Sequence, residues 1–120
     1  MFDACEDAEF DPADIDVVQP YGNFSAQGVA SLIDHGFCTY ENVTEVLRFE
    51  NLIAPSGGLP VNTAGGNFAQ GFVHGIGLAI EAIRQLRGES VNPMPGAKTC
   101  LIAGGPAAPT ISSAVFGRDV

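Results

Sequence analysis

The stretch from Gly57 to Gly88, GGLPVNTAGGNFAQGFVHGIGLAIEAIRQLRG, decides the fold of this 120-residue chain. A glycine-rich loop runs into a segment whose apolar residues recur at helical spacing, which predicts one long helix. Arg84 and Arg87 favour the negative end of that helix, and Gly88 predicts where it ends. Its buried face is expected to carry Phe68, Phe72, Ile76, Ile80 and Ile83.

Gly71 and Gly75 lie four residues apart in this predicted helix and would leave one side of it without side chains. Glycine inside a helix costs about 1 kcal/mol relative to alanine. Two interpretations stay open: something approaches the helix backbone closely, or the helix packs tightly against a sheet. Thr63 or Asn67 would cap the start of the helix.

Local patterns outside this stretch predict a small set of further elements. They are a strand over Asp14–Pro20, a helix over Phe24–Ile33 ending at His35-Gly36, a strand over Lys98–Ala103 and a strand over Thr110–Phe116. Val43–Phe49 is compatible with a short helix or an edge strand. The order strand, helix, helix, strand, strand predicts an α/β domain in which helices cover a mixed sheet.

The composition predicts a folded chain of one domain or less, spanning residues 1–120, that buries surface against something else. Hydrophobic residues make up 46% of the sequence and charged residues only 16%. The net charge of −9 argues against nucleic acid or an anionic membrane as partner. Half of the 14 acidic residues fall in the first 16 positions, as one solvated segment.

The cysteines support neither a disulfide framework nor a metal site. Cys5, Cys38 and Cys100 are odd in number and widely spaced, and no paired Cys or His spacing accompanies them. The acidic N-terminus does not resemble a signal peptide, and no apolar run reaches membrane-spanning length. The cytoplasm is therefore the expected location.

The pairing of LPVNTAGG, residues 59–66, with EAIRQLRG, residues 81–88, is similar to the C-terminal half of thiolase-superfamily proteins. The similarity is to the branch of sterol-carrier-type thiolases and lipid-transfer-protein aldolases, and extends from about Asp11 to Arg118. It implies a five-layered sandwich of two halves, of which this chain supplies part of the second. The N-terminal half, with its nucleophilic cysteine, has no counterpart here.

The resemblance implies a catalytic or substrate-lining role for residues at the start of the predicted helix. Thiolases carry Gly-His-Pro where this chain has Gly71, Phe72 and Val73, so the thiolase histidine is replaced by Phe72. The side-chain-cleaving aldolase branch has Tyr-x-His-Gly, which Phe72–Gly75 resembles without the tyrosine hydroxyl. His74 is thereby implied as catalytic and Phe72 as substrate-lining. The alternative is that His74 is an ordinary histidine on a polar or partly buried helix face.

A second implied catalytic residue is Tyr21, in Tyr21-Gly22-Asn23-Phe24. Sterol-carrier-type members have Tyr-Asp-x-Phe here, so Gly22 stands where a carboxylate is expected. A phenol beside a carbonyl acts as an acid or base if its neighbours lower its pKa from about 10. The alternative is a tyrosine that only caps the sheet edge.

Glycine-rich turns supply the remaining candidate substrate-binding residues, which are Asn62, Gly65, Gly66, Gly104 and Gly105. Backbone amides at a helix start hold anions or carbonyl oxygens well, although these turns are also compatible with capping and strand connection alone. The second catalytic cysteine of thiolases aligns with Leu101. Cys100 lies one residue earlier and would point to the opposite face of a strand, as a buried structural thiol.

Because this chain lacks the catalytic residues that thiolases have at these positions, Claisen chemistry is not expected. The resemblance implies retro-aldol cleavage of a β-hydroxyacyl-CoA, as in steroid side-chain degradation, with the CoA thioester as substrate and no further cofactor. It also implies a homodimer or an N-terminal thiolase half as partner, and a small OB-fold, zinc-ribbon protein. The alternatives are a non-catalytic fragment that binds lipid or acyl-CoA or pairs with a subunit, and a degenerate acyl-CoA acyltransferase.

Overall fold

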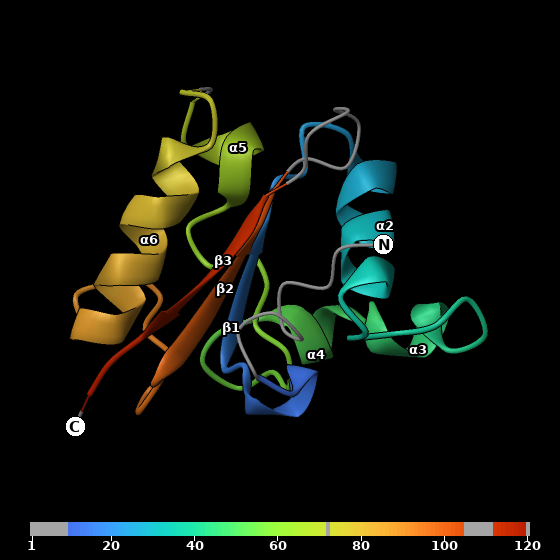
Figure 1. Ribbon diagram of the computed structural model, residues 1–120, viewed down its shortest axis with the longest axis horizontal. Helices are drawn as coiled ribbons and strands as arrows, with labels where there is room; N and C mark the ends of the chain where they lie inside the picture. The colour runs from blue at the N-terminus through green and yellow to red at the C-terminus, as the bar shows by residue number, and fades with distance from the viewer. Residues whose placement is uncertain (1–9, 72, 105–111, 120) are drawn as a thin grey trace.

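The computed structural model describes residues 10–71, 73–104 and 112–119. They form an α/β domain around a mixed sheet in the order β1 (Val17–Pro20), β2 (Thr99–Ala103) and β3 (Ser113–Gly117) (Figure 1). Strands β1 and β2 are parallel, and β2 and β3 are antiparallel. A parallel bridge from Val18 to Val61 extends the pairing beyond β1. The predicted fold class is confirmed.

The helical elements are mostly short. Their bounds are η1 (Pro12–Asp14, a 3-10 turn), α2 (Ser25–Asp34), α3 (Val43–Val46), α4 (Phe49–Leu52), α5 (Gly66–Ala69) and α6 (Ile76–Arg87). The predicted strands and the α2 helix are confirmed to within a few residues. The open choice at Val43–Phe49 is settled as helix. None of the helices in the described ranges is long and apolar enough to cross a membrane.

Helices α2 and α6 cover opposite faces of the sheet (Figure 1). Alternate residues of a strand point to opposite faces, so neighbouring positions serve different cores. Leu101 packs in the core on the α2 side, whereas Cys100 packs with Ala82 and Leu86 of α6. Cys100 is fully buried, as the interpretation of a structural thiol requires.

Both long helices end in glycine. Gly36, at φ 79°, follows α2, and the Phe37 amide returns to the Leu32 carbonyl at 3.0 Å. Gly88, at φ 71°, follows α6, and the Glu89 amide returns to the Arg84 carbonyl at 2.8 Å. These bonds form the glycine-ended motif that satisfies otherwise unpaired carbonyls. The predicted ends at His35-Gly36 and Gly88 are confirmed.

The prediction of one long helix across residues 63–87 is wrong. The chain leaves the helical conformation between α5 and α6, where Gly71, His74 and Gly75 have φ values of 80°, 51° and 82°. Left-handed backbone of this kind favours glycine, so Gly71 and Gly75 serve the break and form no strip along a helix. Gly65 and Gly75 occupy the N-cap positions of α5 and α6, not Thr63 or Asn67.

The predicted buried face of the central helix is also wrong. Ile76, Ile80 and Ile83 are 55%, 44% and 39% exposed, and Phe68 of α5 is 74% exposed. Helix α6 instead buries Leu78, Glu81, Ala82, Gln85 and Leu86. Apolar spacing selected the wrong face because two of the inward positions are polar and are satisfied by hydrogen bonds. We call the exposed set Ile76, Ile80 and Ile83 the isoleucine stripe.

Candidate functional site at the carboxyl edge of the sheet

Several of the predicted site segments begin where parallel strand pairing ends. Tyr21 directly follows β1, and its amide donates to the Ala103 carbonyl at 2.9 Å. Gly104 directly follows β2. Asn62 follows the Val61 bridge, and its amide donates to the Val18 carbonyl at 3.0 Å. The carboxyl edge of a parallel sheet is where α/β proteins place their sites, so these segments define the candidate site.

Tyr21 lies against the backbone of the loop before α6. A Cβ atom built on Gly75 would lie 2.9 Å and 3.0 Å from two carbons of the Tyr21 ring. The aromatic ring therefore occupies the space that any other residue at position 75 would fill. This contact brings the predicted catalytic tyrosine beside the segment that carries the predicted catalytic histidine.

His74 is exposed and lies in this loop, directly before Gly75. The alternative of a histidine on a helix face is therefore wrong, since residue 74 precedes α6. A non-glycine residue at positive φ costs free energy and is held only by its surroundings. Phe72 and Gly105 lie outside the described residues.

Gly75→Ala is expected to destabilise the chain by about 1–3 kcal/mol, since alanine disfavours positive φ and its methyl group would meet the Tyr21 ring. Urea unfolding measures the change. Gly96→Ala is the matched control, because Gly96 has φ 78° but nothing within 4 Å of the added Cβ. An equal loss in both variants would show that the Tyr21 contact adds nothing.

The Asn62–Gly66 loop is tightly wound. Asn62, Gly65 and Gly66 have φ values of 48°, 89° and 60°, and the Gly65 amide donates to the Asn62 carbonyl at 2.7 Å. A Cβ on Gly66 would lie 2.9 Å from Cγ of Asn62, so that side chain packs on the Gly66 backbone. The Asn62 Oδ1 atom is buried and accepts no hydrogen bond within the described chain. Asn62 and Thr63 border a cavity of about 220 Å³.

Gly104 is fixed by its own neighbours. A Cβ on Gly104 would overlap the Ser112 carbonyl oxygen, so only glycine fits there. Its amide donates to Ser113 Oγ at 3.4 Å, and Ser113 Oγ lies 2.9 Å from His35 Nε2. His35 Nδ1 lies 2.7 Å from the Ser31 carbonyl, which only accepts, so Nδ1 donates to it. No local sequence pattern indicated that His35 would be buried and bonded to Ser113.

Glu81 is the second buried residue near the candidate site that the sequence analysis missed. It is 1% exposed, and its Oε1 atom accepts from Thr63 Oγ1 at 2.6 Å, Ser90 Oγ at 2.7 Å and Gln85 Nε2 at 3.0 Å. Thr63 Oγ1 in turn accepts from Gln19 Nε2 of β1 at 3.0 Å. A carboxylate of α6 is thereby joined to the strand and to the loop that form the site.

Cys38 and Cys100, the cysteines in the described ranges, are buried thiols that offer no acid–base chemistry to this edge. Burial raises the pKa of the Cys100 thiol to about 12, and the Glu81 and Asp16 carboxylates act in the same direction. Burial also raises the pKa of Cys38. Leu101, at the position of the second thiolase cysteine, is fully buried. Within the described ranges no group of three His, Cys, Asp or Glu residues gathers as a metal site would require.

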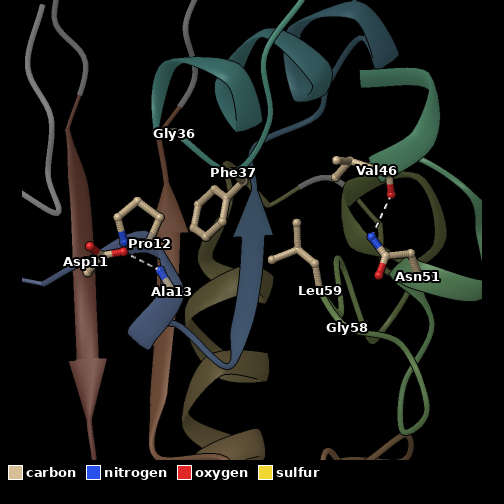
Figure 2. A pocket seen from close by; sticks show the side chains of 9 residues that line it. All are labelled: Asp11, Pro12, Ala13, Gly36, Phe37, Val46, Asn51, Gly58 and Leu59. Carbon is tan, nitrogen blue, oxygen red and sulfur yellow. Dashed lines mark hydrogen bonds between the residues drawn. The ribbon is translucent and has the colours of Figure 1, made fainter. Parts of the chain in front are cut away.

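A larger cavity of about 600 Å³ lies elsewhere, and Figure 2 shows Phe37 and Leu59 among its lining side chains. Asp11–Ala13 and Gly58, which also line it, precede β1 and the Val61 bridge, so the cavity lies at the amino ends of the parallel segments. Asn51 and Val46 also line the cavity, and Asn51 Nδ2 donates to the Val46 carbonyl at 2.9 Å. None of the predicted site residues that the structure describes borders this cavity.

Comparison with known proteins identifies the domain. The family model for thiolase C-terminal domain-like proteins matches residues 2–118. The chain is 34% identical over 99 residues to the 17-hydroxy-3-oxo-4-pregnene-20-carboxyl-CoA lyase of Mycobacterium tuberculosis, covering 82% of this chain and 25% of that protein. It is 32% identical over 108 residues to the steroid side-chain-cleaving aldolase of Thermomonospora curvata, and the match covers 90% of this chain and 27% of that protein.

Among solved structures, a chain of the Ltp2-ChsH2(DUF35) aldolase matches with a TM-score of 0.86 and 29% identity. The match covers 95% of this chain and 29% of that one. The α/β fold is thus that of a thiolase C-terminal domain-like domain. The chain belongs to the thiolase C-terminal domain-like family, in the lipid-transfer branch. It spans between a quarter and 29% of the length of these relatives.

Proposed function

We propose that this chain forms one wall of the active site of an acyl-CoA retro-aldolase that shortens a steroid side chain. The observation that carries the proposal is the Tyr21 ring lying on the Gly75 backbone, at the edge where the Asn62 loop and Gly104 also begin. The names of the aldolase and lyase relatives support the reaction class.

The proposed reaction needs one base and one set of hydrogen-bond donors. The Tyr21 side chain acts as the general base and takes the proton of the substrate's β-hydroxyl. The bond between the α and β carbons then breaks, leaving a ketone on the steroid and an enolate on the thioester. Donors placed in advance stabilise the enolate oxygen, and protonation of the α carbon releases the shortened acyl-CoA. His74, beside Gly75, is the proposed proton donor. The residues proposed to line the substrate are Gly65, Gly66, Phe72, Gly104 and Gly105.

The isoleucine stripe is proposed to contact the part of the thiolase-like protein that this chain does not supply. Exposed apolar side chains gathered on one helix face mark interaction sites. An N-terminal thiolase half or a second copy is the proposed occupant, and an OB-fold, zinc-ribbon protein the proposed additional subunit. The two-part name of the matching aldolase structure supports a multi-subunit assembly. The cytoplasm is the proposed location, and the CoA thioester the only proposed small-molecule requirement.

A non-catalytic role in binding acyl-CoA or pairing subunits is the second candidate. The substitution of the expected tyrosine by Phe72 favours it, because the pocket then has one phenol fewer. The acyltransferase alternative is less well supported, since Leu101 and Cys100 are both buried and the pKa of the Cys100 thiol is raised.

The test is reconstitution of an assembly. This chain is co-expressed with the Thermomonospora curvata aldolase from which the matching C-terminal segment has been removed. A CoA thioester of a 17-hydroxy steroid side chain is then supplied, and mass spectrometry follows the ketosteroid and the shortened acyl-CoA. We expect both products in equal amounts. Assembly and acyl-CoA binding without either product would overturn the retro-aldolase proposal and favour the non-catalytic role.

A further inference from the structure

Helix α6 places a carboxyl group where an apolar side chain is the usual choice. Glu81 is 1% exposed, between Leu78 and Ala82 on the face that packs against the sheet. Burying a carboxylate is costly unless donors replace the water it loses. Here the donors are two hydroxyls and one amide, all directed at the single oxygen Oε1. A buried carboxyl group with three donors gathered on one oxygen needs a reason beyond filling the core.

One of the two hydroxyls belongs to Thr63, in the middle of the candidate site's loop. Thr63 Oγ1 donates to Glu81 at 2.6 Å and accepts from Gln19 Nε2 at 3.0 Å. The backbone carbonyl of Thr63 accepts from Asn92 Nδ2 at 2.8 Å. Thr63 is thus fixed through both its side chain and its main chain.

The residues around Thr63 adopt conformations that do not persist without support. Asn62, Gly65 and Gly66 all have positive φ. Positive φ at a non-glycine residue such as Asn62 persists only where the surroundings hold it. The Asn62 amide is bonded to the Val18 carbonyl and the Gly65 amide to the Asn62 carbonyl, and the bonds that converge on Thr63 add a tie from the middle of the loop to α6 and β1.

We propose that Glu81 is the positioning residue of the candidate site, holding the Asn62–Gly66 loop in its binding conformation through Thr63. Glu81 acts through Thr63 and does not itself contact substrate. The loop's conformation follows from the geometry alone, whereas its importance for turnover rests on the proposed function. The network also gives a reason for a glutamate in the helix core, since serine or asparagine at position 81 is too short to span the same gap.

Two hydroxyls share the Glu81 oxygen, which provides a matched pair of variants. Thr63→Val removes the hydroxyl that leads to the site loop and keeps the side chain's shape. Ser90→Ala removes the hydroxyl that leads to the turn after α6. Both leave Glu81 with one donor fewer. Thr63→Val also removes the acceptor of Gln19 Nε2, and Ser90→Ala removes an acceptor of Gln85 Nε2 and of the Asn92 amide, so a purely structural role predicts that kcat follows stability in both variants. Thr63→Ser restores the hydroxyl and serves as the rescue.

In the reconstituted assembly, Thr63→Val is expected to lower kcat at least tenfold, and Thr63→Ser to recover it to within threefold. Ser90→Ala is expected to keep kcat within twofold of the unmodified chain, even where its melting temperature falls as far as that of Thr63→Val. If kcat follows melting temperature across all three variants, the positioning role is wrong and Glu81 serves stability alone.

A second measurement on the full chain alone separates this inference from the proposed function. The Gly65 amide is bonded to the Asn62 carbonyl at 2.7 Å, so its hydrogen exchange reports the loop conformation directly. Exchange there is expected to accelerate at least tenfold in Thr63→Val and to stay within threefold in Ser90→Ala. Equal acceleration in both variants would overturn the positioning role, whether or not the assembly cleaves any substrate.

Discussion

Replacing Tyr21 by phenylalanine is expected to lower the turnover of the reconstituted assembly by about a hundredfold or more, the usual scale for a lost acid–base group. The substitution removes only the hydroxyl. The ring remains and can keep its contact with the Gly75 backbone, so the melting temperature is expected to change by less than about 2 °C, as for a small local change. Turnover is measured with saturating steroid CoA thioester.

The control is Tyr40→Phe, since Tyr40 is the other tyrosine of the chain and is 79% exposed. It is expected to leave both turnover and stability unchanged. Full turnover in Tyr21→Phe would remove the phenol from the mechanism. A large loss of stability without a specific loss of turnover would instead assign Tyr21 to capping the sheet edge, the alternative that the sequence left open.

The strands and α2 were predictable because each is specified by neighbouring residues. Val17 and Val18 are β-branched and precede Pro20, and the strand Thr99–Ala103 is an apolar run between turn residues. The end of α2 was predictable from Gly36, which supplies the left-handed backbone that a helix needs there. Such signals act over a few residues and do not depend on the rest of the fold.

The break between α5 and α6 was missed because periodicity does not register backbone conformation. Phe68, Phe72 and Ile76 keep helical spacing across the break, yet Gly71 and Gly75 turn the chain out of the helix between them. Of the two interpretations left open for these glycines, close approach of another group to the backbone holds at Gly75, whereas a Cβ on Gly71 would meet nothing within 4 Å. At Gly75 the approaching group is the Tyr21 ring, a contact between residues 54 positions apart that no local pattern contains.

The wrong prediction of which face of α6 is buried has a related cause. Glu81 and Gln85 suggest a solvated face when their side chains are considered singly. Their burial depends on partners from two other segments, Thr63 in the site loop and Ser90 and Asn92 in the turn after α6, which only the folded chain brings together. The isoleucine stripe is an apolar face, as its spacing indicates, but spacing alone could not show that this face is exposed rather than buried.

The isoleucine stripe leads to the second large expected effect. Ile80→Asp is expected to leave the melting temperature of the chain alone within about 3 °C, since Ile80 is already 44% exposed. The same substitution is expected to weaken assembly with the remaining thiolase-like part at least a thousandfold. An isoleucine loses about 1.5–3 kcal/mol of burial there, an unpaired charge adds several more, and 1.4 kcal/mol is tenfold in affinity.

Size-exclusion chromatography with light scattering measures assembly, and Val91→Asp is the matched control. Val91 is also apolar and is 83% exposed, but lies after α6 and away from the stripe, so its variant is expected to assemble normally. Two results would contradict the assignment. Unaltered assembly of Ile80→Asp would mean that the stripe is not the contact surface. A melting temperature lowered by 10 °C or more in the chain alone would mean that Ile80 supports the core, as apolar spacing first suggested.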